Sequence, residues 1–240
     1  EEYRNRVIQL GEHPDRVFNV GGMGIENIKR LNLLCRDEFE DAINFKLGDK
    51  NILVTFHPVT LEKASSEIQF KNLLDAIDEL PGMKTIFTKS NSDTDGRVIN
   101  MMIDDYVRKN PDRSICFTSM GQLKYLSALQ YVDAVVGNSS SGIAEAPSFK
   151  IGTINIGDRQ KGRIKAESVI DVSPDKDAII SAIRRLYSGE FKSKLHEVSN
   201  PYGNGGSSTR IKEVLRSYKL DNIIKKNFFN IYKGDKDAGI

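Results

Sequence analysis

The sequence is poor in the features that mark secreted, membrane-bound and nucleic-acid-binding proteins. It has only two cysteines, Cys35 and Cys116, which are too few for a disulfide framework or a zinc site, so we expect reduced core thiols in a cytoplasmic protein. The longest apolar runs have the length of a strand, so no membrane partner is expected. The 35 basic and 33 acidic residues nearly cancel, which leaves no overall positive charge to attract nucleic acid. Any site for an anion must therefore be local.

The chain also lacks an initiator methionine, and its first residues, EEYRNRVIQL, have the pattern of a helix already under way. We therefore expect a fragment of a longer protein. This acidic, amphipathic opening is unlike a signal peptide, and no internal repeat or low-complexity tract is visible. What is present is ordinary globular composition, with 39% hydrophobic residues over 240 positions, enough for one large domain or two small ones.

From residue 51 onward, short apolar segments alternate with amphipathic ones. The pattern predicts strands at 52–56, 84–88, 114–117, 132–136, 153–156 and 169–172, separated by helices at 65–80, 96–107, 123–129, 142–149 and 175–187. Such alternation implies right-handed crossovers and a parallel sheet, so the predicted fold is an α/β, Rossmann-like, three-layer domain. Ligands of these sheets bind beyond the carboxyl ends of the strands. The expected functional loops are therefore 57–59, 89–95, 118–120, 137–141 and 157–163.

The two ends of the chain read differently. We predict a helix at 2–10 and a strand at 16–20, followed by a glycine-rich bend at 21–24 and an amphipathic segment at 25–35. The bend is either a hinge between domains, the mouth of a nucleotide pocket or a plain loop, and a plain loop is the default. Near the other end, a glycine-rich loop at 202–206 precedes a helix at 208–218 and a lysine-rich tail that we expect to be solvated.

The most informative stretch is 133–163, DAVVGNSSSGIAEAPSFKIGTINIGDRQKGR. Serines stand at 139–141, where the N-cap of the predicted helix falls, and Glu145 follows in its first turn. Unpaired main-chain N–H groups at a helix N-terminus favour a phosphate or diphosphate, and three cations follow in the loop 158–163. The competing interpretation is an ordinary capped helix beside a solvated loop.

The segment GNSSSGIAEA followed by GTINIGDRQKGR resembles the nucleotide-binding segment of the UDP-N-acetylglucosamine 2-epimerases, most of all the hydrolysing branch that feeds sialic acid synthesis. The segment FHPVT, 56–60, resembles the histidine-proline-valine segment of that family. Members have two Rossmann-like domains facing across a cleft, as in GT-B glycosyltransferases, and this chain resembles the second. We therefore predict that 1–20 is a remnant of the N-terminal domain and linker, 21–206 the UDP-binding domain, and 207–240 a C-terminal helix with a basic tail.

The resemblance also implies roles for individual residues in a UDP site. It implies His57 beside the phosphates as a catalytic donor to the leaving group, Asn91 on the nucleotide, Met120 in the uracil-proximal loop, Ser139 and Ser140 on the diphosphate, Glu145 on the ribose and Arg159 on a phosphate or an ordering carboxylate. No metal or cofactor is implied.

By the same resemblance, the whole enzyme removes the C2 proton of UDP-GlcNAc, expels UDP and adds water to release N-acetylmannosamine. The catalytic carboxylates would lie in the missing N-terminal domain, so the chain alone should bind UDP weakly without turnover, and the full protein should be a homo-oligomer. Three alternatives remain open: a non-hydrolysing epimerase, a hydrolysing relative acting on a diacetamido sugar nucleotide of the legionaminic acid pathway, and the donor domain of a GT-B glycosyltransferase.

Overall fold

The computed structural model describes residues 1–59, 63–90, 94–221 and 223–231. Its centre is a six-stranded sheet in the order β3-β2-β1-β4-β5-β6, and every neighbouring pair of strands is parallel. The strands are β1 (Lys50–Thr55), β2 (Met83–Thr88), β3 (Ser114–Phe117), β4 (Ala134–Gly137), β5 (Gly152–Ile156) and β6 (Val169–Val172). The predicted parallel sheet is confirmed, with each strand within two residues of its expected ends.

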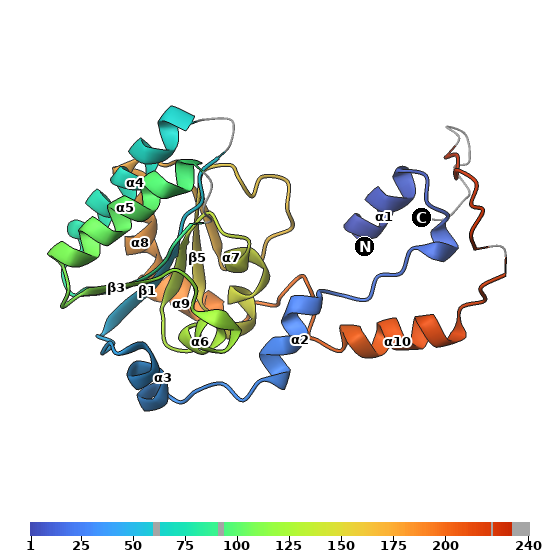
Figure 1. Cartoon of the computed structure of the whole chain (residues 1–240), viewed down its shortest axis with the longest axis horizontal. Coiled ribbons are helices and arrows are strands. Elements are labelled where there is room, and N and C mark those ends of the chain that lie inside the picture. The colour runs from blue at the N-terminus through green and yellow to red at the C-terminus, as the bar shows by residue number, and fades with distance from the viewer. Residues whose placement is uncertain (60–62, 91–93, 222, 232–240) are drawn as a thin grey trace.

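Helices cover both faces of this sheet because side chains alternate along each buried strand. In β1, Ile52 and Val54 enter one core cluster, whereas Leu53 enters the other. The helices of the central domain are α3 (Arg36–Ile43), α4 (Lys63–Asp78), α5 (Thr94–Lys109), α6 (Gly121–Ala128), α7 (Ser141–Ala144), α8 (Lys176–Leu186) and α9 (Gly189–Leu195). Helices α4, α5 and α8 pack on one face, and α3 and α6 on the other (Figure 1). The three-layer, Rossmann-like prediction is thus confirmed.

The order in which strands are added to the sheet reverses between β1 and β4, which are neighbours in space although β2 and β3 separate them in sequence. The chain leaves β1 toward α4 on one face and leaves β4 toward α7 on the other, so the two exits diverge. Gly137 pairs with Thr55 at the end of both strands. Gly137 has a φ of +130°, and a Cβ added to it would lie 2.0 Å from the Thr55 carbonyl oxygen, so only glycine fits at this position. This topological switch point is where doubly wound sheets bind ligands.

The single helix predicted at 142–149 is wrong in detail. The structure has one α-helical turn, α7, followed by the 3-10 helix η2 (Ala146–Phe149). Pro147 explains the break, because it lacks the N–H that would donate to the carbonyl of Ile143 in a continuous α-helix. The dipole behind the serines is therefore that of one turn rather than two.

The strand predicted at 16–20 is also wrong. Residues 14–16 form the 3-10 helix η1 (Pro14–Arg16), and the extended residues after it join no sheet. Arginine side chains, rather than a neighbouring strand, satisfy its carbonyl groups: Arg4 donates to Val17 at 2.9 Å and Arg210 to Val20 at 2.8 Å. The apolar residues of this segment predicted a strand, but a strand needs a partner strand.

Residues from both ends of the chain come together beside the sheet domain. Figure 1 shows α1 (Glu2–Gln9), η1 and the segment after α10 (Ser207–Ser217) on the same side of the molecule. Phe18 meets Tyr218 edge to face, and the Phe229 N–H donates to the Gly11 carbonyl at 2.9 Å. The basic segment after α10, in its described part, is exposed as predicted except for half-buried Tyr218 and Phe229. We call this assembly of 1–20 and 207–231 the terminal lobe.

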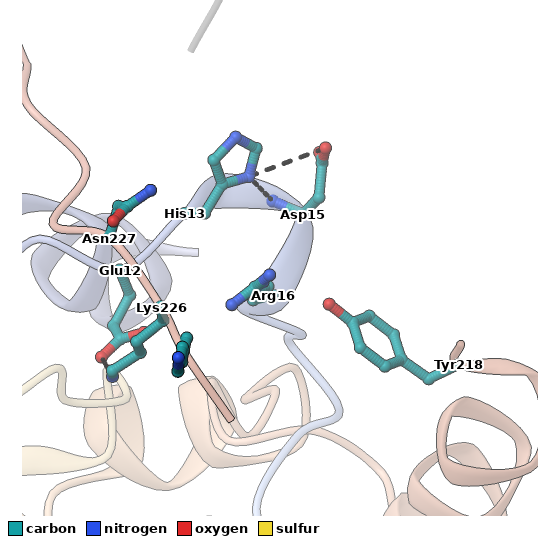
Figure 2. A pocket seen from close by; sticks show the side chains of 8 residues that line it. Glu12, His13, Asp15, Arg16, Tyr218, Lys226 and Asn227 are labelled. Carbon is teal, nitrogen blue, oxygen red and sulfur yellow. Dashed lines mark hydrogen bonds and ion pairs between the residues drawn. The ribbon is translucent and has the colours of Figure 1, made fainter. Parts of the chain in front are cut away.

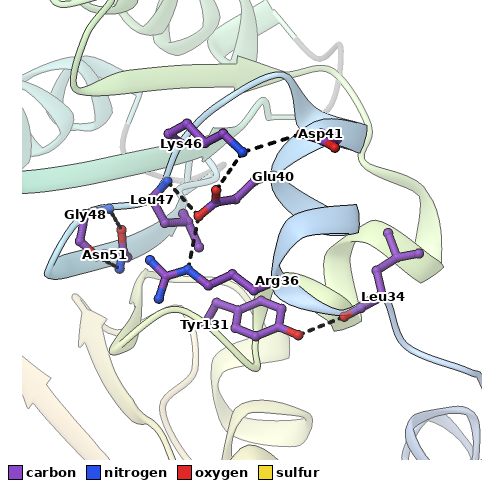
Figure 3. A network of polar contacts seen from close by, with 9 residues as sticks. All are labelled: Leu34, Arg36, Glu40, Asp41, Lys46, Leu47, Gly48, Asn51 and Tyr131. Atoms are coloured by element: carbon purple, nitrogen blue, oxygen red, sulfur yellow. Dashed lines mark hydrogen bonds and ion pairs between the residues drawn. The ribbon is translucent and has the colours of Figure 1, made fainter.

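The amphipathic segment predicted at 25–35 begins within α2 (Met23–Arg30) and continues as an extended apolar stretch that leads into α3. Figure 3 shows how α3 is fixed: the buried carboxylate of Glu40 accepts from Arg36 and from the Leu47 N–H, and pairs with Lys46. The expectation of two core thiols is wrong for Cys35, which is exposed at the start of α3, whereas Cys116 is half-buried.

Candidate functional site

A cleft of about 400 Å³ lies at the carboxyl edge of the sheet. Its walls come from the ends of β1, β2, β3 and β4 and from the helices that follow the last two. The lining residues are Thr55, His57, Thr88, Lys89, Thr118, Ser119, Met120, Gly121, Gln122, Tyr125, Leu126, Ser139, Ser141 and Glu145. Four predicted site residues, His57, Met120, Ser139 and Glu145, are therefore brought together from separate parts of the chain.

His57 sits directly beyond β1, and both polar groups of its peptide are held by Asn138. The His57 N–H donates to Oδ1 of Asn138, and Nδ2 of Asn138 donates to the His57 carbonyl, both at 2.7 Å. The ring nitrogen Nδ1 lies 3.3 Å from the hydroxyl of Ser90, beyond β2. The position of the imidazole at the cleft is thus set by the β2 and β4 loops.

Arg159 does not line the cleft but lies behind it, in the loop after β5. Its guanidinium donates to the main-chain carbonyl of Asn138 at 3.0 Å, and Gln160 donates to the same carbonyl at 2.7 Å. Partial burial of the guanidinium, together with nearby Arg163, lowers the pKa of Arg159. The β5 loop therefore brings a partly desolvated cation to the β4 turn, and such a cation pairs strongly with an anion.

The serines predicted at the helix N-terminus have unequal positions. Ser139 lines the cleft, and its hydroxyl accepts from the Ser141 N–H at 3.4 Å. Ser140 is exposed, occupies the N-cap and makes no side-chain capping bond. Among the described residues, no acceptor satisfies the main-chain N–H groups of Ser140 and Gly142. Donors of this kind remain available to an anion even though the helix is one turn long.

Glu145 ends α7, and its half-buried carboxylate lines the cleft. Its charge contributes to raising the pKa of Tyr125, which places the two side chains near each other. An ideal Cβ on Gly24, in the first turn of α2, would lie 3.8 Å from Oε1 of Glu145. The glycine-rich bend at 21–24 thus passes close to the wall of the cleft, which is compatible with the interpretation of the bend as the mouth of a pocket.

A set of buried hydroxyls below the cleft could not be recognised from the sequence. The hydroxyls of Thr55 and Thr88 are 2.5 Å apart across β1 and β2, and Tyr125 lies 2.5 Å from the hydroxyl of Ser141. Burial raises the pKa of Tyr125, so it stays a neutral donor. These residues come from four different elements, and only their contact makes them a polar floor.

Met120 lies at the cleft with its side chain turned into the core, where only 6% of the residue is exposed. The main chain at the start of α6 is therefore the part that a ligand can meet, which suits the predicted uracil contact through N–H and C=O groups. The prediction for Asn91 lies outside the described residues.

A second hollow, of about 510 Å³, lies in the terminal lobe (Figure 2). None of the predicted site residues lines it, and its polar groups contact one another: Lys226 pairs with Glu12, and Nδ1 of His13 accepts from the Asp15 N–H at 3.3 Å. Within the described ranges, no group of three or more His, Cys, Asp and Glu residues is arranged to hold a metal ion. The helices of that same part of the chain are too short or too polar to cross a bilayer.

A parallel sheet with a polar cleft at its switch point is the arrangement in which doubly wound α/β domains bind ligands. The model of the family described as UDP-N-acetylglucosamine 2-epimerase matches residues 1–216, and the chain belongs to that family. It is 40% identical over 232 residues to the GDP/UDP-N,N'-diacetylbacillosamine 2-epimerase (hydrolyzing) of Campylobacter jejuni, covering 96% of this chain and 60% of that protein. It is 38% identical over 233 residues to polysialic acid biosynthesis protein P7 of Escherichia coli, covering 96% and 59%.

The solved structure of the UDP-GlcNAc 2-epimerase of Methanocaldococcus jannaschii, in complex with UDP-GlcNAc and UDP, aligns with a TM-score of 0.68 at 20% identity. The alignment covers 89% of this chain and 58% of that one, so it shows a shared fold. The chain thus spans about three-fifths of the length of the curated relatives it matches. This agrees with the expectation that it holds the second half of a two-domain, GT-B-type protein.

Proposed function

We propose that this chain is the UDP-binding part of a hydrolysing UDP-sugar 2-epimerase. The observation that carries the proposal is the cleft itself. His57, Ser139 and Glu145 line it, and Arg159 donates to the main chain of the turn after β4, which forms one of its walls. Membership of the epimerase family makes a sugar nucleotide the expected ligand. Two relatives whose names include hydrolyzing, from Campylobacter jejuni and Legionella pneumophila, support the hydrolytic outcome.

The proposed binding mode follows the chemistry of each wall. Glu145 accepts hydrogen bonds from the two vicinal ribose hydroxyls, which is how α/β proteins commonly hold a ribose. The diphosphate meets the hydroxyls of Ser139 and Ser140, the main-chain N–H groups of the β4 turn and the cation of Arg159. The uracil lies against the main chain of 118–120 at the start of α6.

In the proposed reaction a base takes the C2 proton, and the C1–O bond breaks with its electron pair passing to the β-phosphate of UDP. Water then adds across the resulting double bond, its oxygen at C1 and a proton at C2 from the opposite face, which inverts C2. The contribution of this chain is to stabilise the charge that builds on the diphosphate, through His57, Arg159 and the N–H groups. The base and acid belong to carboxylates of the other domain, and we propose a homo-oligomer for the complete enzyme.

UDP-GlcNAc, giving N-acetylmannosamine for sialic acid synthesis, is the first substrate candidate, and the relative named for polysialic acid biosynthesis favours it. A diacetamido sugar nucleotide is the second, favoured by the relatives named diacetylbacillosamine 2-epimerase. The complete enzyme incubated with each sugar nucleotide separates them, because proton NMR distinguishes N-acetylmannosamine from a diacetamido product. Retention of UDP in the product would instead indicate a non-hydrolysing epimerase.

Calorimetric titration of the 240-residue chain with UDP tests the binding role. Binding of UDP but not AMP is expected, together with a loss of about tenfold or more in affinity for Arg159→Ala and for Glu145→Ala, since each removes a charged hydrogen bond of about 1.5–3 kcal/mol. Arg184→Ala and Glu167→Ala are matched controls, because both side chains are exposed and neither lines the cleft. Equal affinity in all four variants would refute the proposed site.

A further inference from the structure

The polar groups of Asn138 join three of the loops that carry predicted site residues. It is 1% exposed and directly follows β4. Its side-chain amide makes the two bonds to the His57 peptide, and its own N–H donates to the Thr55 carbonyl at 3.2 Å. Its carbonyl accepts from Arg159 and Gln160. The turns after β1 and β4 and the loop after β5 therefore meet at this residue.

We propose that Asn138 is the positioning residue of the diphosphate site, which it builds by fixing His57, the 139–140 hydroxyls and Arg159 in one arrangement. The inference rests on the proposed UDP-binding function and deepens it. Asn138 itself does not line the cleft. It acts through the groups that it holds.

The chemistry of the side chain explains why an asparagine is required. The paired bonds to His57 need one donor and one acceptor at fixed separation, and the amide supplies both. An aspartate has the same shape but offers two acceptors, so one oxygen would face the His57 carbonyl with no proton between them. Asn138→Asp therefore breaks one bond of the pair and sets two acceptors against each other in a buried site, where unmet polar groups are costly.

Gln160 provides independent support for this role. It is 1% exposed, and its side-chain oxygen is buried without a donor among the described residues. A buried orphan acceptor of this kind is exceptional and calls for an explanation. Here the side chain is oriented so that its nitrogen donates to the Asn138 carbonyl at 2.7 Å. The side-chain oxygen of Gln160 thus remains without a hydrogen bond while the side-chain nitrogen holds the carbonyl of Asn138.

The chain contains a matched control at the amino ends of the strands, opposite the cleft. Asn51, which is 5% exposed, makes the same reciprocal pair with the peptide of Gly48: it accepts at 2.8 Å and donates at 2.9 Å (Figure 3). Asn51→Asp breaks the same kind of bond at the start of β1, away from the cleft. It therefore measures the effect of the substitution on the fold away from the cleft, together with repulsion between the new carboxylate and Asp133, whose Oδ2 accepts from the Asn51 N–H at 2.8 Å.

The experiment measures UDP and uridine affinities of the 240-residue chain and of both variants, by calorimetry for UDP and ligand-observed NMR for uridine. We expect Asn138→Asp to weaken UDP binding about tenfold or more while uridine changes less than about threefold, because the phosphates meet the displaced groups. Asn51→Asp should leave both affinities within about twofold, at a comparable loss of melting temperature.

Equal UDP affinities in the two variants, or equal losses for UDP and uridine in Asn138→Asp, would overturn the positioning role while the proposed function stands. If the parent chain binds no UDP, the proposed function fails and the inference falls with it. Should Asn138→Asp not fold, Gln160→Leu decides, since it removes only the donor to the Asn138 carbonyl. A UDP affinity lowered about threefold or more supports the role, and an unchanged affinity refutes it.

Discussion

Substituting Gly137 by alanine tests the geometry on which the whole cleft depends. The residue ends β4 at the switch point with a φ of +130°, a conformation that side chains with L chirality rarely adopt. An added Cβ would lie 2.0 Å from the carbonyl oxygen and 2.8 Å from the carbonyl carbon of Thr55. Both atoms belong to main chain that is paired within the sheet, so no flexible side chain can move aside.

The expected cost has two parts. A positive φ costs an alanine about 1–2 kcal/mol. Relief of the contact requires β4 to move away from β1, comparable to overpacking a core at about 1–3 kcal/mol. Together they lower the free energy of unfolding by about 2–5 kcal/mol, which in a domain of 150–250 residues lowers the melting temperature by about 4–20 °C.

Gly82→Ala provides the comparison, because Gly82 also has a positive φ, +76°, but an added Cβ would meet nothing within 4 Å. Only the first cost applies, about 1–2 kcal/mol or about 2–8 °C. Thermal unfolding followed by circular dichroism measures both variants. A Gly137→Ala variant no less stable than Gly82→Ala would refute the close approach of β4 to β1, and with it the geometry of the switch point.

Three further predictions concern the cleft and its supports. Glu145→Gln should reduce the preference for UDP over 2′-deoxy-UDP by about threefold or more, as measured by calorimetry with Glu167→Gln as the control. An unchanged preference would contradict the ribose contact. Burial raises the pKa of Glu40, but hydrogen bonds from Lys46, Arg36 and Leu47 outweigh it and lower the pKa below 4.5. The carboxylate therefore stabilises the fold above about pH 4.5 and loses that effect as the pH falls through the lowered pKa. Glu40→Gln should flatten the pH dependence of the free energy of unfolding in urea below about pH 5. An unchanged pH dependence would contradict this role. Tyr125→Phe removes the hydroxyl beside Ser141 and should cost about 1–2 kcal/mol in the same urea assay, whereas no loss would mean that water replaces that contact.

The strands and their loops could be predicted from the sequence because their signals are local. Each strand is a short apolar run between polar turns, and alternation with helices allows essentially one handedness of crossover. Once the strands are parallel, every loop at a carboxyl end must lie at the same edge. The loops that carry His57 and Ser139 could therefore be placed at one edge of the sheet, whereas the grouping of both residues with Glu145 in one site came from the family resemblance.

What the sequence could not show depends on contacts between distant segments. The extended residues 17–20 have the pattern of a strand, yet arginines from α1 and α10 take the place of a partner strand. No sequence pattern singles out Asn138, which follows a predicted strand, or Tyr125, which lies within a predicted helix. Their roles arise from the His57 peptide, 81 residues away, and from the hydroxyl of Ser141. No pattern confined to one segment contains that information.

The loop after β5 has a second anchor, in the terminal lobe. The Ile164 N–H donates to the hydroxyl of Tyr3 at 3.1 Å, and Tyr202 donates to the Ile164 carbonyl at 2.9 Å, with the two tyrosine rings stacked at 6.3 Å. The same loop carries Arg159, five residues earlier. One short segment is thus held by Asn138 of the β4 turn at one end and by Tyr3 of α1 at the other. The position of Arg159 therefore depends on contacts with the terminal lobe as well as with the β4 turn.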